Sequence, residues 1–351
     1  MSTIIGVDAH KRVHQAVAID AVGHELGQWR GANTPAAWQK LAAWAAQWPS
    51  DRSWGIEGAG QYGRGLAQHL VTAGERVVEV NPRQTAVMRR GGRARGKSDR
   101  LDALAVARVV LQEGAALPQV VAEDMTAVLA VLVAERDGAV AEATRLRNQL
   151  HQLLLQLSFV DPQAWPDLTA AAAVRGLTAY QAPSSDAVVQ ARAASVRRLA
   201  ARLTLALEQA ATLQQEIETG AGQTVPALLT LPGVAALTAG MLAAHLGCGP
   251  RFATDAQLAA YAGVAPLDAA SGDHIRHRLN RTGNRALNAL IHRIALVQAR
   301  CYPPAQTYLA RRQAEGKTRK EALRALKRFI VCAVFRRWQQ CFPLPAAPAL
   351  T

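Results

Sequence analysis

Cysteine is scarce in this chain, and long apolar runs are missing. The 351 residues include four cysteines, none of them in a C-x-x-C pair. No apolar stretch reaches the roughly 20 residues that a membrane-spanning helix needs, and residues 1–20 lack a signal-peptide pattern. We therefore expect a reduced, cytoplasmic protein without a membrane partner.

Acidic residues are also few. The chain has 26 Asp and Glu against 40 Lys and Arg, a formal net charge of +14 and a sequence pI of about 10.5. A balance this basic predicts a polyanionic partner, above all nucleic acid. A charge that serves solubility alone is the alternative, but so large an excess is an inefficient way to achieve it.

Two of these few acids stand three residues apart. Asp99 and Asp102 open a stretch that predicts a helix through Gln112, because its apolar residues recur at helical spacing. Positions i and i+3 share one face of a helix, so both carboxylates can reach one point, where Mg²⁺ or Mn²⁺ would relieve their repulsion. The alternative is a plain helix N-terminus, whose positive dipole end favours acids without any ion.

Two further acids end short apolar stretches upstream. A meander of three strands followed by helix–strand alternation predicts a mixed sheet with helices packed on it. We expect the strands at residues 3–8, 13–19, 25–30, 54–57 and 77–80. The first and fourth strands, which end in Asp8 and Glu57, can be neighbours in such a sheet, so these two carboxylates could converge.

Together the four acids predict a metal site. Four carboxylates around one cleft can hold two ions roughly 4 Å apart, the arrangement that clamps both oxygens in phosphodiester displacement. The alternative for each residue taken singly is that Asp8 is an ordinary turn residue and that Glu57 is a solvated strand end.

A basic segment punctuated by glycines lies between these acids. It suits the phosphate backbone of a nucleic acid better than a small metabolite, and we expect it to be flexible. A solvated charged loop is the alternative. The residues expected to contact phosphates are Arg89, Arg90, Arg93, Arg95 and Lys97.

The middle of the chain carries two seams of apolar residues. From Met125 to Leu157 the intervals between apolar positions alternate between four and three, which is a heptad pattern. A second seam runs from Val196 to Ile217, and Gly220 is expected to end that helix. The two helices can fold back on each other as a hairpin or pair with a second subunit, and periodicity does not separate these possibilities.

A Leu-Pro-Gly turn opens the C-terminal part. Leu231, Pro232 and Gly233 precede a helix of small residues that we expect to reach His245. The pattern is typical of a helix-hairpin-helix, in which backbone N–H groups at Gly233 would bind a phosphate without reading the sequence. An ordinary packing turn is an equal alternative. Further helices are expected at residues 256–261, 285–300 and 320–338.

A polar, basic segment lies between two of these helices. It contains Ser271, followed by glycine, and four arginines, of which Arg276, Arg278 and Arg281 are expected DNA contacts. Arginines can stabilise the charge on an attacked phosphate, and a metal or a base can activate a serine. Composition alone nevertheless favours a simple turn at Ser271.

In their order along the chain, these motifs resemble one known family. The motifs are Ile5-Gly6-Val7-Asp8, Ile56-Glu57-Gly58, Asn81-Pro82, Lys97-Ser98-Asp99-Arg100-Leu101-Asp102, Tyr261-Ala262-Gly263, Ser271-Gly272 and Thr282-Gly283-Asn284. The chain resembles the DEDD-type transposases of bacterial insertion sequences, the "one-ten" family, which includes bridge-RNA-guided recombinases. Ser98 stands where that family usually has Thr, and Ala59 where it has Thr or Ser. Neither difference removes a carboxylate.

The resemblance implies a fold and a division of the chain. It implies a RuvC-like domain of the ribonuclease H fold at residues 1–118 and coiled-coil helices at 119–222 that help build a homodimer or homotetramer. A transposase domain with a helix-hairpin-helix would occupy residues 223–345. The expected fold class is therefore α/β at the N-terminus and mostly helical beyond it.

The resemblance also implies site residues and partners. Asp8, Glu57, Asp99 and Asp102 would bind Mg²⁺ or Mn²⁺, and Ser271 matches the family's nucleophilic serine. Donor and target DNA duplexes would be the partners, and a structured guide RNA from the element's own flank would select them. The protein would then work at the nucleoid of a bacterial cell.

We predict an insertion-sequence transposase that cleaves and rejoins DNA through a covalent phosphoserine at Ser271. A metal-dependent, junction-resolvase-like nuclease is the first alternative, and it would cleave by water attack without that serine. A non-catalytic nucleic-acid-binding protein is the second. It leaves the four acids unexplained, since acids in a DNA cleft weaken binding unless a metal is present.

Overall fold

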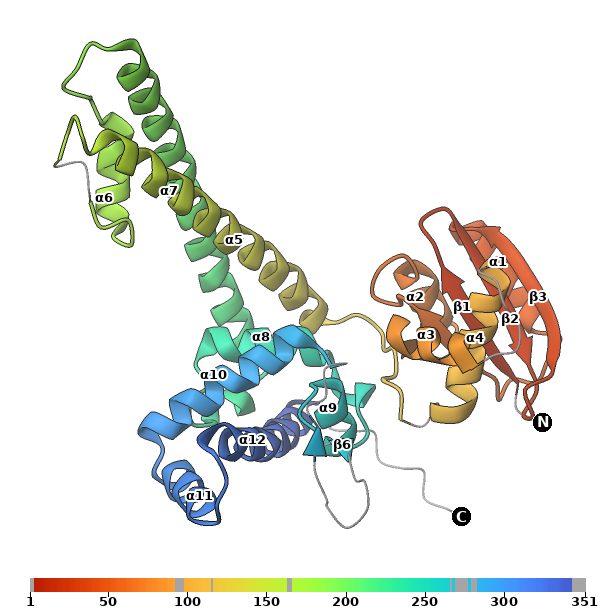
Figure 1. Ribbon diagram of the computed structural model, residues 1–351. Helices are drawn as coiled ribbons and strands as arrows, with labels where there is room; N and C mark the ends of the chain where they lie inside the picture. The colour runs from red at the N-terminus through yellow and green to blue at the C-terminus, as the bar shows by residue number, and fades with distance from the viewer. Residues whose placement is uncertain are drawn as a thin grey trace. The chain divides into compact units, whose positions relative to one another are not determined.

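Figure 1 shows the computed structural model of the chain. It describes residues 3–91, 98–114, 116–162, 166–265, 267–268, 277–278 and 283–342, except for the side chains of residues 89–91, 250, 267, 268, 277 and 278. Its contacts divide into two units. One unit contains Met1–Asp124, Thr230–Gly233 and Leu246–Thr351, and the other contains Met125–Leu229 and Val234–His245.

A five-stranded mixed sheet forms the N-terminal part of the first unit. Its strands are β1 (Ile4–Ala9), β2 (Val13–Ile19), β3 (Glu25–Ala32), β4 (Ser53–Glu57) and β5 (Arg76–Val80). They lie in the order β3-β2-β1-β4-β5, with the first three antiparallel and β4 and β5 running parallel to β1. The predicted mixed sheet, with its first and fourth strands side by side, is confirmed.

Helices cover both faces of this sheet (Figure 1). Successive side chains of a strand point to opposite faces, and the sequence supplies apolar residues to both. On one face Ile5 and Val7 of β1 belong to the core that includes α1 (Pro35–Ala45) and α2 (Arg64–Thr72). On the other face the core includes α4 (Asp99–Glu113).

One part of the basic segment is helical. The expectation of a flexible segment is wrong for α3 (Pro82–Gly91), which begins with the proline at its first position. Asn81 stabilises that start, because its Oδ1 accepts a hydrogen bond from Arg83 N–H at 2.9 Å and its own N–H donates to Gln84 Oε1 at 3.1 Å. These two bonds satisfy backbone groups that a helix start leaves open.

The second unit is built on two long helices. α5 (Met125–Leu157) and α7 (Ala187–Thr224) pack along each other as an antiparallel hairpin, with α6 (Ala171–Gly176) beside them (Figure 1). The hairpin is one of the two arrangements that the heptad pattern left open. Pairing with a second subunit stays a prediction.

Two details of the hairpin differ from the sequence-based expectation. Gly220 does not end α7, which continues to Thr224, because the missing side chain makes room for Leu129 of α5. A Cβ on Gly220 would lie 3.0 Å from Leu129 Cδ2. A strict alternation of four and three from Met125 predicts Leu132 and Leu153 in the seam. The buried residues are instead Val133 and Leu154, as expected where straight helices depart from a strict seven-residue repeat.

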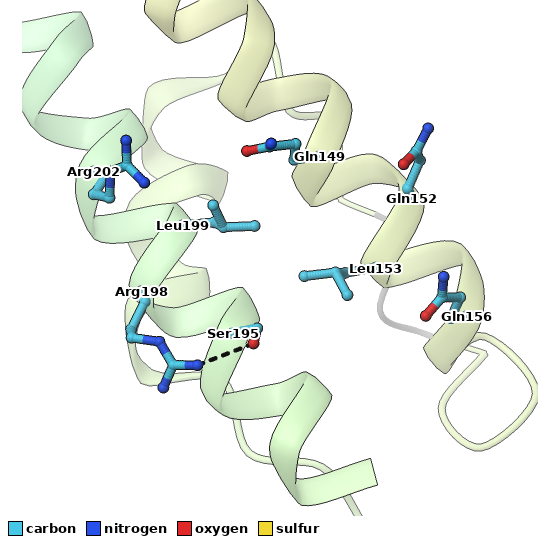
Figure 2. A pocket seen from close by; sticks show the side chains of 8 residues that line it. All are labelled: Gln149, Gln152, Leu153, Gln156, Ser195, Arg198, Leu199 and Arg202. Atoms are coloured by element: carbon cyan, nitrogen blue, oxygen red, sulfur yellow. Dashed lines mark hydrogen bonds between the residues drawn. The ribbon is translucent and has the colours of Figure 1, made fainter. Parts of the chain in front are cut away.

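A hollow of about 480 Å³ opens between α5 and α7. Figure 2 shows Leu153 and Leu199 pointing toward each other across it, with Arg198 donating a hydrogen bond to Ser195 Oγ at 3.0 Å. None of the predicted site residues lines it. The lining residues, mostly polar, are Gln149, Gln152, Leu153, Gln156, Ser195, Arg198, Leu199 and Arg202.

The C-terminal part is mostly helical, as predicted. Its helices are α8 (Ala236–Leu246), α9 (Asp255–Tyr261), α10 (Arg285–Cys301), α11 (Pro303–Ala314) and α12 (Arg319–Cys341), with a short strand pair β6 (Leu267–Asp268) and β7 (His277–Arg278). The sequence analysis missed α11, which starts at a proline in the first helical position. None of the described helices is long and apolar enough to cross a membrane.

Candidate metal centre

A pair of glycines allows α4 to lie directly on the sheet. Gly6 and Gly55 are register partners on β1 and β4. A Cβ on Gly6 would lie 2.3 Å from both Ala103 O and Ala107 N, and a Cβ on Gly55 would lie 2.3 Å from Val110 Cγ2. Real Cβ atoms do not come so close to other atoms, so each position requires glycine at this distance between helix and strand.

Each glycine is followed two residues later by an acid. Asp8 and Glu57 are register partners in their turn. Because residues i and i+2 of a strand share a face, both acids lie on the side of the sheet that α4 covers. The predicted convergence of the two strand ends therefore follows from the sheet register.

The first turn of α4 carries the other two acids. Ser98 caps the helix, since its Oγ accepts a hydrogen bond from Leu101 N–H at 3.3 Å, so the helical turn begins at Asp99. Asp102 is buried, with 8% of its surface exposed, whereas the Asp99 side chain is about half exposed. A plain N-terminal acid would remain in solvent, and Asp102 does not.

The pKa of Asp8 is affected by the three other acids. Burial, the largest cause, raises the pKa of Asp8 to about 6, nearby His10 opposes that rise, and repulsion from Asp102, Glu57 and Asp99 adds to it. Carboxylates raise one another's pKa only at short range. The structure thus places Asp102, Glu57 and Asp99 near enough to Asp8 for their charges to act on it, and carboxylate oxygens of Asp8 and Asp99 lie within 4.8 Å of each other.

The donor set fits a divalent cation. Asp8 Oδ2 is buried and makes no hydrogen bond with the described residues. A buried acceptor in that state is costly unless a cation or a donor pairs with it. Oxygen donors from several carboxylates are the set that Mg²⁺ and Mn²⁺ prefer.

Two more nitrogen-bearing side chains lie beside the acids. His10, which sequence analysis missed, has its Nε2 3.0 Å from Asp8 Oδ2 and 3.8 Å from Asp99 Oδ1. Its position two residues after Asp8 was the available signal, because that spacing points to the same side of the strand end. Arg30 of β3 places a guanidinium nitrogen 4.0 Å from Asp99 Oδ2.

Glu57 is held in place by a buried hydroxyl that nothing in the sequence indicated. Thr85 of α3 is 1% exposed, and its Oγ1 donates a hydrogen bond to Glu57 Oε2 at 2.6 Å. A carboxylate that binds a metal is usually oriented by such a partner. Thr85 therefore ties the orientation of Glu57 to the helix that opens the basic segment.

Replacing Thr85 by Val should lower divalent-metal affinity about tenfold or more, because Glu57 would lose its orienting donor. Stability should fall by only about 1–2 kcal/mol, the cost of one buried acceptor left unpaired. Mn²⁺ titration and thermal unfolding measure the two effects. Thr85→Ser should restore affinity, and Thr72→Val, which removes an exposed hydroxyl on α2, should leave it unchanged. A Thr85→Val protein with unaltered affinity would show that Thr85 is merely structural.

Several predicted site residues lie outside the described residues. These are Arg93, Arg95, Lys97, Ser271, Arg276 and Arg281. Arg89 and Arg90 lie on α3 and Arg278 lies on β7, as backbone positions only. Their predicted contacts with DNA stay predictions.

The two ends of the segment that contains Ser271 are held together. A Cβ on Gly283 would lie 2.3 Å from Gly263 N, so the backbones meet at a pair of glycines. Asn284 fixes the same junction, since its N–H donates to Tyr261 O at 2.7 Å and its Nδ2 donates to the Tyr261 hydroxyl at 3.2 Å. The serine segment thus leaves and re-enters the helical part at one point.

The turn at Gly233 has the backbone that the sequence suggested. Gly233 has φ of +81°, a conformation that favours glycine, and precedes α8. A 3₁₀ helix of five residues (Pro226–Thr230) comes before it. The turn packs against α10, where Gln298 Nε2 donates to Pro232 O at 2.7 Å. Packing of this kind suits the plainer alternative, and phosphate binding at Gly233 stays a prediction.

Comparison with known proteins decides the family. A family model described as "Transposase", for the DEDD transposases of IS110, matches residues 5–159, and a second, described as "Transposase IS116/IS110/IS902 family", matches residues 225–310. Together they match more than half of the chain. The chain belongs to this transposase family.

Individual relatives of the transposase include proteins of three insertion elements. The IS900 "uncharacterized 42 kDa protein" of Mycobacterium paratuberculosis is 28% identical over 92% of this chain and 92% of its own length. The IS116 "uncharacterized 44.8 kDa protein" of Streptomyces clavuligerus is 25% identical over 92% of this chain and 91% of its own length. The IS110 protein of Streptomyces coelicolor is 36% identical over 40% of this chain and 35% of its own length.

Among solved structures, RuvC of Thermus thermophilus in complex with a Holliday junction substrate is similar. It is 15% identical, with a TM-score of 0.26, over 32% of this chain and 93% of that one.

Membership of the family bears on the cofactor and the partner. The DEDD type of this transposase implies a divalent metal, and Asp8, Glu57, Asp99 and Asp102 are four acids in the order that this type names. A transposase acts on DNA, so the nucleic acid that the charge of +14 predicts is DNA.

Proposed function

We propose that this transposase cleaves and rejoins the DNA of its insertion sequence through a covalent phosphoserine at Ser271. Asp8, Glu57, Asp99 and Asp102 would hold Mg²⁺ or Mn²⁺ next to the reacting phosphate. The observation that carries the proposal is the placement of the acids: Asp8 and Glu57 are register partners on the sheet face that α4 covers, and buried Asp102 lies in the first turn of that helix. Such a cluster has little use in a DNA-binding protein unless it holds a metal.

The serine step balances without any energy-rich cofactor. Ser271 Oγ attacks phosphorus, the Oγ–P bond forms, and the P–O bond to one strand end breaks. The serine proton ends on the departing oxygen, which leaves as a hydroxyl. Because the phosphodiester is exchanged and not hydrolysed, the hydroxyl of another strand can attack the phosphoserine and reverse the step.

The chain's own residues orient this exchange. A bound divalent ion would supply Lewis-acid stabilisation of the phosphate oxygens. Thr85 would keep Glu57 turned toward it, and the junction at Gly263 and Gly283 would present the serine segment from a fixed base. The basic residues proposed to bind the phosphate backbone are Arg89, Arg90, Arg93, Arg95, Lys97, Arg276, Arg278 and Arg281, with backbone N–H groups at Gly233.

The division of labour along the chain is part of the proposal. Residues 1–118 would form the metal domain, 119–222 the coiled-coil spacer and 223–345 the transposase domain. Exchange between donor and target duplexes needs more than one active site, which favours a homodimer or homotetramer. Guidance by a structured RNA rests on the family resemblance alone.

A denaturing gel tests the proposal. Full-length protein is incubated with Mg²⁺, DNA that carries the element's ends, and RNA transcribed from its flank. We expect a protein–DNA adduct that survives denaturation and disappears in Ser271→Ala, with a loss of strand exchange on the order of 10³-fold or more. Ser158→Ala, which alters an exposed serine on the hairpin, is the matched control and should form the adduct normally.

Other outcomes of that gel separate the alternatives. Metal-dependent cleavage that persists without an adduct in Ser271→Ala would identify a nuclease. Binding of DNA with neither adduct nor cleavage would identify a non-catalytic protein.

A further inference from the structure

His10 contacts two of the four acids, Asp8 and Asp99, and has no role in the function proposed above. It follows β1 by one residue, and its side chain is about half exposed. One ligand atom from each of Asp8, His10 and Asp99 lies within 4.8 Å of the other two. Among the described residues, these three form the group of His, Cys, Asp or Glu side chains whose ligand atoms are close enough to share a metal ion.

His10 and Asp8 lie at ion-pair distance but without the alignment of a hydrogen bond. His10 Nε2 is 3.0 Å from Asp8 Oδ2, yet that oxygen has no hydrogen-bond partner among the described residues. Two donor atoms that lie this close without bonding to each other are arranged like neighbouring ligands of a third body. Adjacent ligands of an octahedral ion, each roughly 2.1 Å from it, are about 3 Å apart.

We propose that His10 is a nitrogen ligand of the metal centre and that it biases the centre toward Mn²⁺ and other transition ions over Mg²⁺. Imidazole nitrogen is a better ligand for transition metals than for Mg²⁺, which prefers oxygen. With Asp8 and Asp99 it would supply two oxygens and one nitrogen to the ion. The inference rests on the proposed metal centre and adds its fifth ligand and its ion preference.

A different role for His10 would have the opposite effect on metal binding. If the ring served only as a cation that neutralises Asp8, it would compete with the metal, and its removal would strengthen binding. A ligand, in contrast, weakens binding when it is removed. The sign of the change in Mn²⁺ affinity therefore separates the two roles.

Pulsed electron paramagnetic resonance of Mn²⁺ bound to the full-length protein tests the proposal without relying on activity. We expect nitrogen coupling to the bound ion, and labelling with [¹⁵N]histidine should change its frequency. His10→Ala and His10→Asn should both lose the coupling and bind Mn²⁺ about tenfold more weakly, while Mg²⁺ affinity falls less. His24→Ala is the matched control, because His24 is exposed on the β2–β3 turn and pairs with Asp20.

The outcomes distinguish this inference from the function on which it rests. One outcome is that Asp8→Asn loses Mn²⁺ binding while the wild-type spectrum shows no histidine coupling. That result would overturn the role of His10 and leave the four-acid centre intact. Tighter Mn²⁺ binding by His10→Ala would do the same. Mn²⁺ binding that Asp8→Asn does not change would overturn both the ligand and the centre.

Discussion

Asp8→Asn should abolish strand cleavage while making the metal-free protein more stable at neutral pH. Asp8 is 6% exposed, and burial together with the other three acids raises its pKa to about 6. The amide removes a buried negative charge and one ligand at the same time. We expect cleavage to fall by on the order of 10³-fold or more, because an essential part of the metal's ligand set is gone.

The stability difference between Asp8→Asn and the wild type should depend on pH. A carboxyl whose pKa is higher in the folded state than in the unfolded state binds more protons when folded, so stability falls as pH rises between the two values. For Asp8 the window runs from 3.8 to about 6. Asp8→Asn should therefore equal the wild type below this window and exceed it by about 1–3 kcal/mol above it.

Urea unfolding in EDTA across this pH range measures the difference. Addition of Mg²⁺ at a thousand times its Kd should reverse the ranking at pH 7, since a ligand stabilises only the protein that binds it, here by about 4.1 kcal/mol. If the wild type were the more stable protein in EDTA at pH 7, the carboxylates would not be crowded as described.

Gly6→Ala should have the largest effect on folding. The new Cβ would lie 2.3 Å from Ala103 O and Ala107 N, which are backbone atoms of α4. No side-chain rotation relieves that contact, so the whole helix must move away from β1. We expect a loss of about 3 kcal/mol or more in unfolding free energy, at the upper end for an overpacked core.

The same substitution should also weaken metal binding, because α4 carries Asp99 and Asp102 and its displacement separates them from Asp8. Thermal unfolding and Mn²⁺ titration, the latter below the unfolding temperature, test both parts. Gly60→Ala is the matched control, since nothing lies within 4 Å of a Cβ at that position. If Gly6→Ala bound Mn²⁺ normally, the contact between strand and helix would not position the acids.

Much of the acidic cluster could be predicted from the sequence because its parts are local. Asp8 and Glu57 each end a short apolar run, and the i, i+3 spacing of Asp99 and Asp102 is visible directly. A meander followed by helix–strand alternation indicates a mixed sheet, in which the first and fourth strands can be neighbours. The metal site stays a prediction; the register of Asp8 with Glu57 and the approach of Asp99 to Asp8 are what the structure shows of it.

The parts that sequence analysis missed depend on distant contacts. The pairing of Gly6 with Gly55 has meaning only once β1 and β4 are neighbours and α4 lies across them. Thr85 reaches Glu57 from a helix that follows another strand. Gly220 illustrates the same limit in reverse: a residue typical of helix ends lies within a helix because Leu129 fills the space beside it.

Local rules also failed where one residue type serves two purposes. The sequence analysis expects no helix between residues 300 and 320, yet proline at a first helical position starts α11. Pro82 does the same for α3, so part of an expected flexible segment is helical. At both places the proline occupies the first helical position, where its missing N–H costs no hydrogen bond.

A titration of Mn²⁺ into four single variants tests the central claim most directly. The claim is that carboxylates from β1, β4 and α4 act as one centre. The variants are Asp8→Asn, Glu57→Gln, Asp99→Asn and Asp102→Asn. Each should weaken the same high-affinity binding about tenfold or more, and the double variant Asp8→Asn with Asp102→Asn should lose less than the sum of the two single losses. Unchanged Mn²⁺ affinity in Glu57→Gln or Asp102→Asn, or strictly additive losses, would contradict the account.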